Sequence, residues 1–136
     1  EGAHSPLIGD NRADLLIALE RHEALRASST VLKIGGRLIY YNTVWQPLSV
    51  RLNDVQAVTE DDIRELASAR KINVVCVFQA DLPDIRMQNM VVLAEINRHR
   101  LIPDIELKAY RSAMTDLMTG TTLASNRALF DARLKA

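Results

Sequence analysis

Two adjacent glycines lie between two short runs of strand-forming residues, and this arrangement limits the folds open to the 136-residue chain. Residues 30–34 and 37–41 are rich in β-branched, aliphatic and aromatic residues, and only Gly35 and Gly36 separate them. Two-residue glycine turns join antiparallel strands, because glycine readily adopts the positive φ that such turns require. The sequence therefore predicts a β-hairpin over residues 30–41.

Two further segments have the composition of strands. Residues 45–52 include Pro47, which cannot donate a ladder hydrogen bond and so favours the edge of a sheet. Residues 72–78 are apolar almost throughout, as a strand covered on both faces would be, and we expect them at the centre of the sheet. We predict an α+β fold, with a small mixed or antiparallel sheet of about four strands, packed helices and a further C-terminal helix.

Capping residues and apolar spacing predict five helices. Asp10 or Asn11 can cap a helix with Leu15, Leu16 and Leu19 on its apolar stripe. Thr59 precedes three acidic residues in a first turn, where the helix dipole favours negative charge. The predicted helices cover residues 11–29, 59–70, 84–99, 104–118 and 125–135.

The charge balance excludes two classes of partner. The chain carries 17 Lys and Arg against 17 Asp and Glu, so no net field attracts nucleic acid or an anionic membrane. Its longest apolar runs are far shorter than the roughly 20 residues that span a bilayer. Cys76 is the single cysteine and lies within an apolar run, so we expect it buried, in a protein of the reducing cytoplasm.

The sequence predicts neither a metal site nor a cofactor. His4, His22 and His99 are far apart, and one cysteine cannot form a thiolate cage. The acidic residues 60–62 should project in different directions from a first helical turn and serve its dipole. The glycine pair matches no phosphate-binding motif, and no acid–base or nucleophile set is apparent.

Aromatic residues and arginines concentrate on and after the predicted hairpin. Three of the six aromatic residues fall within residues 40–45, where aromatic faces and guanidinium groups could hold a planar or anionic ligand. The alternative is that one tyrosine faces solvent while Trp45 packs in the core. The candidate ligand-binding residues are Arg37, Tyr41, Trp45 and Arg51.

The helix predicted at 104–118 carries an apolar seam. Four of its apolar residues are separated by three, four and three positions, the a/d spacing of a two-helix contact. Two copies of the chain could pack along this seam as a homodimer. The candidate dimer-interface residues are Leu107, Tyr110, Met114 and Leu117.

The last 24 residues carry the most specific pattern. Residues 113–120 read Ala-Met-Thr-Asp-Leu-Met-Thr-Gly, and residues 126–130 read Asn-Arg-Ala-Leu-Phe. The pattern resembles the opening segment of GGDEF-family diguanylate cyclases, Ala-x-x-Asp-x-Leu-Thr-Gly followed by a short connector and Asn-Arg-x-x-Phe. Two features depart from the family: Met118 replaces a leucine, and the connector at 121–125 is longer than usual.

The resemblance implies how the chain is organised. Residues 1–10 contain Gly2, Pro6 and Gly9 and show little periodicity, so we expect a flexible arm there. By the resemblance, residues 11–102 would be an α+β sensor or regulatory domain, and 103–118 a coiled-coil-like connector that acts as a signalling helix. Residues 119–136 would begin a truncated GGDEF-like output domain. That segment stops before the loop that handles GTP and metal in the family, so we expect no catalysis from this chain.

Two functions remain open. The first is a regulatory dimerisation domain that controls a diguanylate cyclase in cyclic di-GMP signalling. Its partners would be a second copy, the output domain in the same chain, and a small-molecule or protein signal. The second is a stand-alone structural or adaptor protein that mediates protein–protein assembly.

Overall fold

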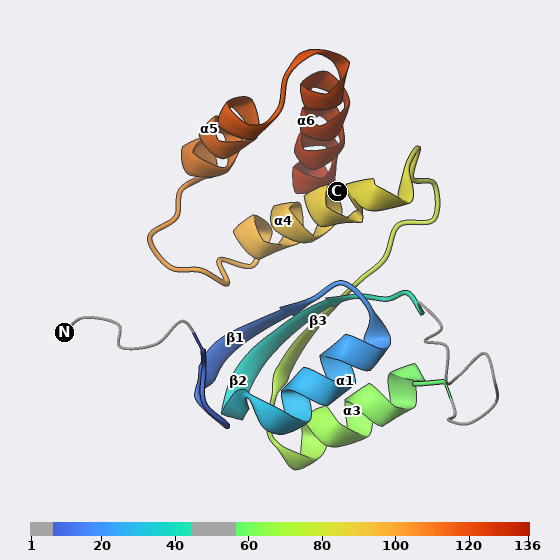
Figure 1. The fold of residues 1–136 in the computed structure, drawn as a ribbon, viewed down its shortest axis with the longest axis vertical. Helices are drawn as coiled ribbons and strands as arrows, with labels where there is room; N and C mark the ends of the chain where they lie inside the picture. The colour runs from blue at the N-terminus through green and yellow to red at the C-terminus, as the bar shows by residue number, and fades with distance from the viewer. Residues whose placement is uncertain (1–6, 45–56) are drawn as a thin grey trace. The chain divides into compact units, whose positions relative to one another are not determined.

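A computed structural model describes residues 7–44 and 57–136. The chain divides into two compact units, Glu1–Cys76 (unit 1) and Val77–Ala136 (unit 2) (Figure 1). The division falls inside residues 11–102, for which the sequence predicts one domain.

Unit 1 contains a three-stranded sheet in the order β1 (Ala13–Ala18), β2 (Leu32–Tyr41), β3 (Asn73–Val77). The strands run parallel, and helices α1 (Arg21–Thr30) and α3 (Glu60–Ala69) connect them (Figure 1). Parallel crossovers are almost always right-handed, so two successive steps in one direction place both helices on one face.

The predicted α+β class is confirmed, but its details differ. The described residues form a parallel sheet of three strands rather than a mixed or antiparallel sheet of about four. The strand predicted at 45–52 lies outside the described residues.

The prediction of one helix over residues 11–29 is wrong for the first half of that range. Strand β1 occupies Ala13–Ala18, and α1 begins only at Arg21. The side chain of Glu20 caps this helix, accepting hydrogen bonds from the backbone N–H groups of His22 (2.9 Å) and Glu23 (2.5 Å). Parallel strands have continuous apolar runs, which periodicity alone does not distinguish from a helix.

The predicted hairpin is also wrong, because β2 is one continuous strand through both glycines. Ala13 pairs with Leu32, and Leu15 pairs with Arg37. Two steps along β1 therefore correspond to five steps along β2, so β2 contains three extra residues between these pairs. Gly35 adopts a φ of +74° and donates its N–H to the carbonyl of Arg70 (2.9 Å). The glycines therefore form a bulge rather than a turn.

Strand β3 exists as predicted but lies at the end of the sheet order, and β2 is central. Val77 is buried, whereas Val74 is 39% exposed and Cys76 is exposed. The expectation of a buried cysteine in a central strand is therefore wrong. An apolar run shows that a segment is a strand, but the order of strands depends on the connections.

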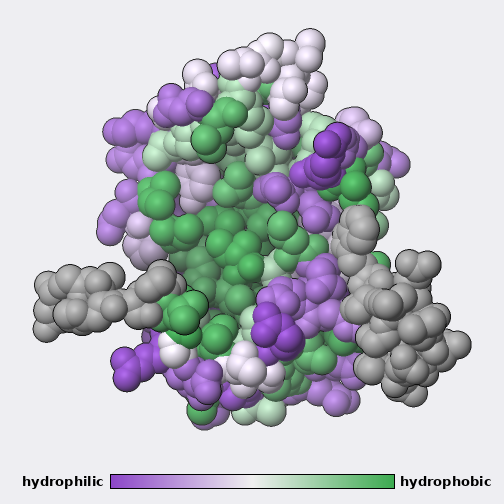
Figure 2. Space-filling model, in the orientation of Figure 1, coloured by the Kyte–Doolittle hydropathy of each residue, from purple (hydrophilic) through white to green (hydrophobic). Residues whose placement is uncertain are grey.

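The core of unit 1 lies between the sheet and the two helices. Leu38 and Tyr40 of β2 reach it from the sheet, and Ala24 of α1 and Ile63 of α3 reach it from the helices. Its remaining buried members are Ala13, Ala18, Leu32, Ala67 and Ile72. Figure 2 shows that hydrophobic side chains also reach the surface among hydrophilic ones on the face drawn.

Unit 2 is helical. It contains a 3-10 turn η1 (Ile85–Met87), α4 (Gln88–Arg98), α5 (Leu107–Leu117) and α6 (Gly120–Lys135). The helices predicted at 84–99 and 104–118 are confirmed in position. The last helix begins at Gly120, five residues before the predicted start at residue 125.

Aromatic stacking and one buried carboxylate hold the helices of unit 2 together. The rings of Tyr110 on α5 and Phe130 on α6 stack with centroids 6.1 Å apart. Glu95 on α4, only 4% exposed, accepts hydrogen bonds from Arg133 of α6 (2.6 Å) and from Arg98 (3.0 Å). His99 also approaches its carboxylate, at 3.3 Å.

We expect Glu95→Ala to lower the free energy of unfolding by about 2 kcal/mol, because it leaves Arg133 without its buried partner. Glu65→Ala, at an exposed position on α3, should change that free energy by less than about 0.5 kcal/mol. Urea denaturation followed by circular dichroism measures both variants. Equal stability of Glu95→Ala and wild type would contradict this role of Glu95.

The glycine bulge gives a second prediction. A methyl group at Gly36 would lie 2.8 Å from Leu32 Cδ1 and 2.9 Å from the carbonyl oxygen of Lys33, so Gly36→Ala should cost roughly 1–3 kcal/mol. Gly35→Ala meets no atom but strains a positive φ, and should cost about 1 kcal/mol. Gly9→Ala has neither problem and serves as the control in the same urea titration. A Gly36→Ala variant as stable as Gly9→Ala would contradict the close packing of Gly36 against Leu32 and Lys33.

Candidate functional site

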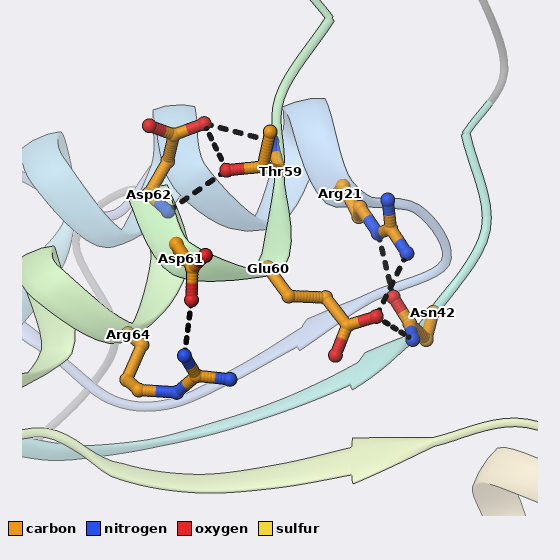
Figure 3. Close-up of polar contacts among 7 residues, drawn as sticks. All are labelled: Arg21, Asn42, Thr59, Glu60, Asp61, Asp62 and Arg64. Carbon is orange, nitrogen blue, oxygen red and sulfur yellow. Dashed lines mark hydrogen bonds and ion pairs between the residues drawn. The ribbon is translucent and has the colours of Figure 1, made fainter.

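The candidate site lies at one edge of unit 1, where β2 ends and helices α1 and α3 begin (Figure 3). In open sheets of parallel strands, ligands bind outside the carboxyl ends of the strands. Polar side chains from three segments meet at this edge, and an apolar hollow adjoins them.

Arg21, Asn42 and Glu60 form a closed hydrogen-bonded group, which we call the Arg21 cluster (Figure 3). Arg21 donates from Nε to Asn42 Oδ1 (2.6 Å) and from Nη2 to Glu60 Oε1 (3.0 Å). Asn42 Nδ2 donates to the same Glu60 oxygen (2.8 Å). The cluster ties the start of α1, the end of β2 and the start of α3 together.

The three acidic residues that begin α3 have three different partners (Figure 3). Glu60 belongs to the Arg21 cluster, and Asp61 pairs with Arg64. Asp62 accepts hydrogen bonds from the Thr59 N–H (2.7 Å) and hydroxyl (2.7 Å), while its own N–H donates to the Thr59 hydroxyl (3.2 Å). The predicted divergence of these acids is confirmed.

Carboxylates occupy the helix starts at this edge. Glu20 accepts the first free N–H groups of α1, and Thr59 with Asp62 forms a capping box on α3. The hydrogen bonds from Thr59 lower the pKa of Asp62. The backbone N–H groups of His22, Glu23 and Asp62, which could otherwise hold a phosphate, therefore already have carboxylate or hydroxyl partners.

Beside the Arg21 cluster lies a cavity of about 350 Å³, which we call the α3–β3 hollow. Its apolar walls come from Ile63 and Ala67 of α3 and from Ile72 and Val74 at β3. The polar residues that line it are Tyr40, Glu60, Arg64, Ser68 and Cys76. Its volume falls at the lower end of the range for small-molecule sites.

Tyr40 brings a neutral hydroxyl to the hollow. Burial raises the pKa of Tyr40, and a hydrogen bond with Cys76 raises it further. The phenol therefore stays protonated at physiological pH, and it can donate or accept a hydrogen bond. Within the part of the chain that the structure describes, no group of three or more His, Cys, Asp or Glu side chains could hold a metal ion.

Only two of the four predicted ligand-binding residues, Arg37 and Tyr41, lie in the part of the chain that the structure describes. Arg37 and Tyr41 lie on the same face of β2, but four residues apart, which is about 13 Å along a strand. Tyr41 is buried and Arg37 half-buried. Trp45 and Arg51 lie outside the described residues.

Sequence reasoning missed the Arg21 cluster and the hollow. Arg21 and Glu60 are first residues of helices, and Asn42 directly follows a strand. These positions could have been found only if residues 13–41 had been read as strand, helix and parallel strand.

The predicted dimer seam is divided between the interior and the surface of unit 2. Tyr110 and Met114 are buried within the chain, Leu107 is half-buried, and Leu117 is 80% exposed. Leu117 thus remains the most accessible of the four residues.

Comparison of the sequence with models of known protein families and with curated proteins finds no match. Among the described residues, no helix has the length and apolarity needed to cross a membrane.

The cap of α3 gives a prediction on stability. Thr59→Ala should lower the free energy of unfolding by about 1 kcal/mol, because it removes the hydroxyl that accepts the Asp62 N–H. Urea denaturation at neutral pH measures this loss, with Ser68→Ala on the same helix as the control. An unchanged midpoint for Thr59→Ala would contradict the cap.

The lowered pKa of Asp62 gives a prediction on pH. The stability that its carboxylate contributes is complete above its ordinary pKa of 3.8 and is lost as the pH falls through the lower pKa of the folded state. The difference in stability between wild type and Asp62→Asn should therefore be largest near neutral pH and shrink below pH 3.8. Urea titrations across this range test it, and a difference independent of pH would contradict it.

Proposed function

We propose that this chain is a non-catalytic regulatory module of a cyclic di-GMP signalling protein, which dimerises and controls a diguanylate cyclase domain. The support is the resemblance of residues 113–130 to the opening segment of that domain family, together with the way this segment folds. The sensed signal would act on the α+β part of the chain.

The observation that carries the proposal is the break between α5 and α6. Helix α5 ends at Leu117, and Met118 and Thr119 have extended backbones. Gly120 then begins α6 with a φ of +57°. The break thus falls on the Met-Thr-Gly positions, where the family pattern passes from the connector into the output domain.

The two halves of the pattern therefore lie on different helices. Residues 113–117 close α5, and residues 126–130 lie within α6, where Phe130 is fully buried. One feature departs from the family, because residues 121–125 are helical here rather than a connecting loop.

The proposal assigns α5 the role of dimer contact through its exposed apolar residues. Leu117, next to the break, is exposed to solvent and is not part of the buried core of unit 2. A contact there would bring two output domains together. Each would supply one GTP to a product with two-fold symmetry, so a change in the pairing of the helices would alter output.

The alternative is an adaptor protein that mediates assembly without an output domain. The pairing of Glu95 with Arg133 and the stacking of Tyr110 on Phe130 favour it, because they make α6 part of a compact unit with α4 and α5. The reading frame after Ala136 separates the two proposals. A continuation into a Gly-Gly-Asp/Glu-Glu-Phe loop supports regulation of a cyclase, and an immediate stop codon supports the adaptor.

The dimer is tested by light scattering on the chain and two variants. Wild type should reach twice the monomer mass of 15.2 kDa, and Leu117→Glu should weaken the dimer at least about tenfold, because it places a charge in an apolar contact. Ser112→Glu adds the same charge at an exposed position two residues from Tyr110 and should leave the dimer intact. A wild-type chain that stays monomeric at high concentration would overturn this part of the proposal.

A further inference from the structure

The α3–β3 hollow has the walls of a binding site for an apolar group. Ile63 and Ala67 of α3 line it together with Ile72 and Val74. Val74 is 39% exposed, so apolar surface in the hollow now contacts water. A ligand with an apolar body would remove that surface from water.

The hollow also offers polar groups that can orient such a ligand. Tyr40 is almost fully buried, and it lines the hollow together with Cys76. A thiol is a weak hydrogen-bonding partner, so the phenol retains capacity for a stronger oxygen partner. Ser68 adds a second hydroxyl to the lining.

The charges at the rim of the hollow are already paired. Glu60 accepts hydrogen bonds from Arg21 and Asn42, and Arg64 pairs with Asp61. A charged ligand would have to break one of these pairs in order to be neutralised, whereas an uncharged ligand breaks none. The carboxylates that close the nearby helix starts disfavour an anion further.

From these walls, hydroxyls and paired charges, we infer that the α3–β3 hollow binds a small uncharged molecule with an apolar body and one hydroxyl or carbonyl group. The apolar body would lie against Ile63 and Val74, and the polar group would lie at Tyr40. The inference does not depend on the proposed function, because it concerns only unit 1.

The test uses three probes of similar shape and different charge: benzyl alcohol, benzoate and benzylammonium. Each is titrated into the ¹⁵N-labelled chain while amide chemical shifts are recorded. Benzyl alcohol should cause saturable shifts at residues 63–68 and 74–76. Benzoate and benzylammonium should bind at least about tenfold more weakly, because neither charge has a free partner at the rim.

Two substitutions fill the hollow, and one matched substitution does not. Val74→Phe should weaken benzyl alcohol binding at least about tenfold, and Ser68→Phe, at an exposed position on α3, should do the same. Asn73→Phe places the same ring on the neighbouring exposed position of β3, where the side chain points to the opposite side of the strand. It should leave binding unchanged.

Several results would overturn the inference. One is equal binding of all three probes, and another is wild-type affinity in a folded Val74→Phe or Ser68→Phe variant. A third is saturable shifts confined to residues outside the hollow, or no saturation at all. If Val74→Phe does not fold, Ser68→Phe decides the question, because its exposed position tolerates a larger side chain.

Discussion

The parallel pairing of β1 with β2 determines the arrangement of unit 1. A parallel pair cannot be joined by a tight turn, so a crossover helix, α1, must lie between the two strands. The step from β2 to β3 repeats this connection with α3. Both helices then begin at the same edge, where the strands end, and this brings Arg21, Asn42 and Glu60 within hydrogen-bonding distance.

The sequence predicted the elements better than their pairing. Helix α3 was predicted with its cap at Thr59, because an acidic first turn after a hydroxyl is a local signal. The pairing of β2 was not, because the positive φ of Gly35 suits a hairpin turn and a bulge equally. Only the partner strand decides between them, and β1 was itself hidden in an apolar run that also suits a helix.

The candidate site was less predictable than the fold. Arg21, Asn42 and Glu60 belong to no motif, and they are 21 and 18 residues apart in sequence. Their proximity is a consequence of topology, which local patterns do not contain. The sequence pointed instead to Arg37 and Tyr41, which share strand β2 but lie four residues apart along it. The divergence of the acids on α3 was predictable, because helix geometry alone fixes it.

The same carboxylates that stabilise the helix starts also determine which ligand class fits this edge of unit 1. Helix N-termini at the carboxyl ends of parallel strands would normally attract phosphate. Here Glu20 accepts the N–H groups of His22 and Glu23, and the Thr59 hydroxyl accepts the N–H of Asp62. Glu60 neutralises Arg21, so no cationic group of the Arg21 cluster remains for an anion. With these donors and charges satisfied, the selectivity left to the α3–β3 hollow is that of apolar contact and the Tyr40 hydroxyl, which favours an uncharged molecule.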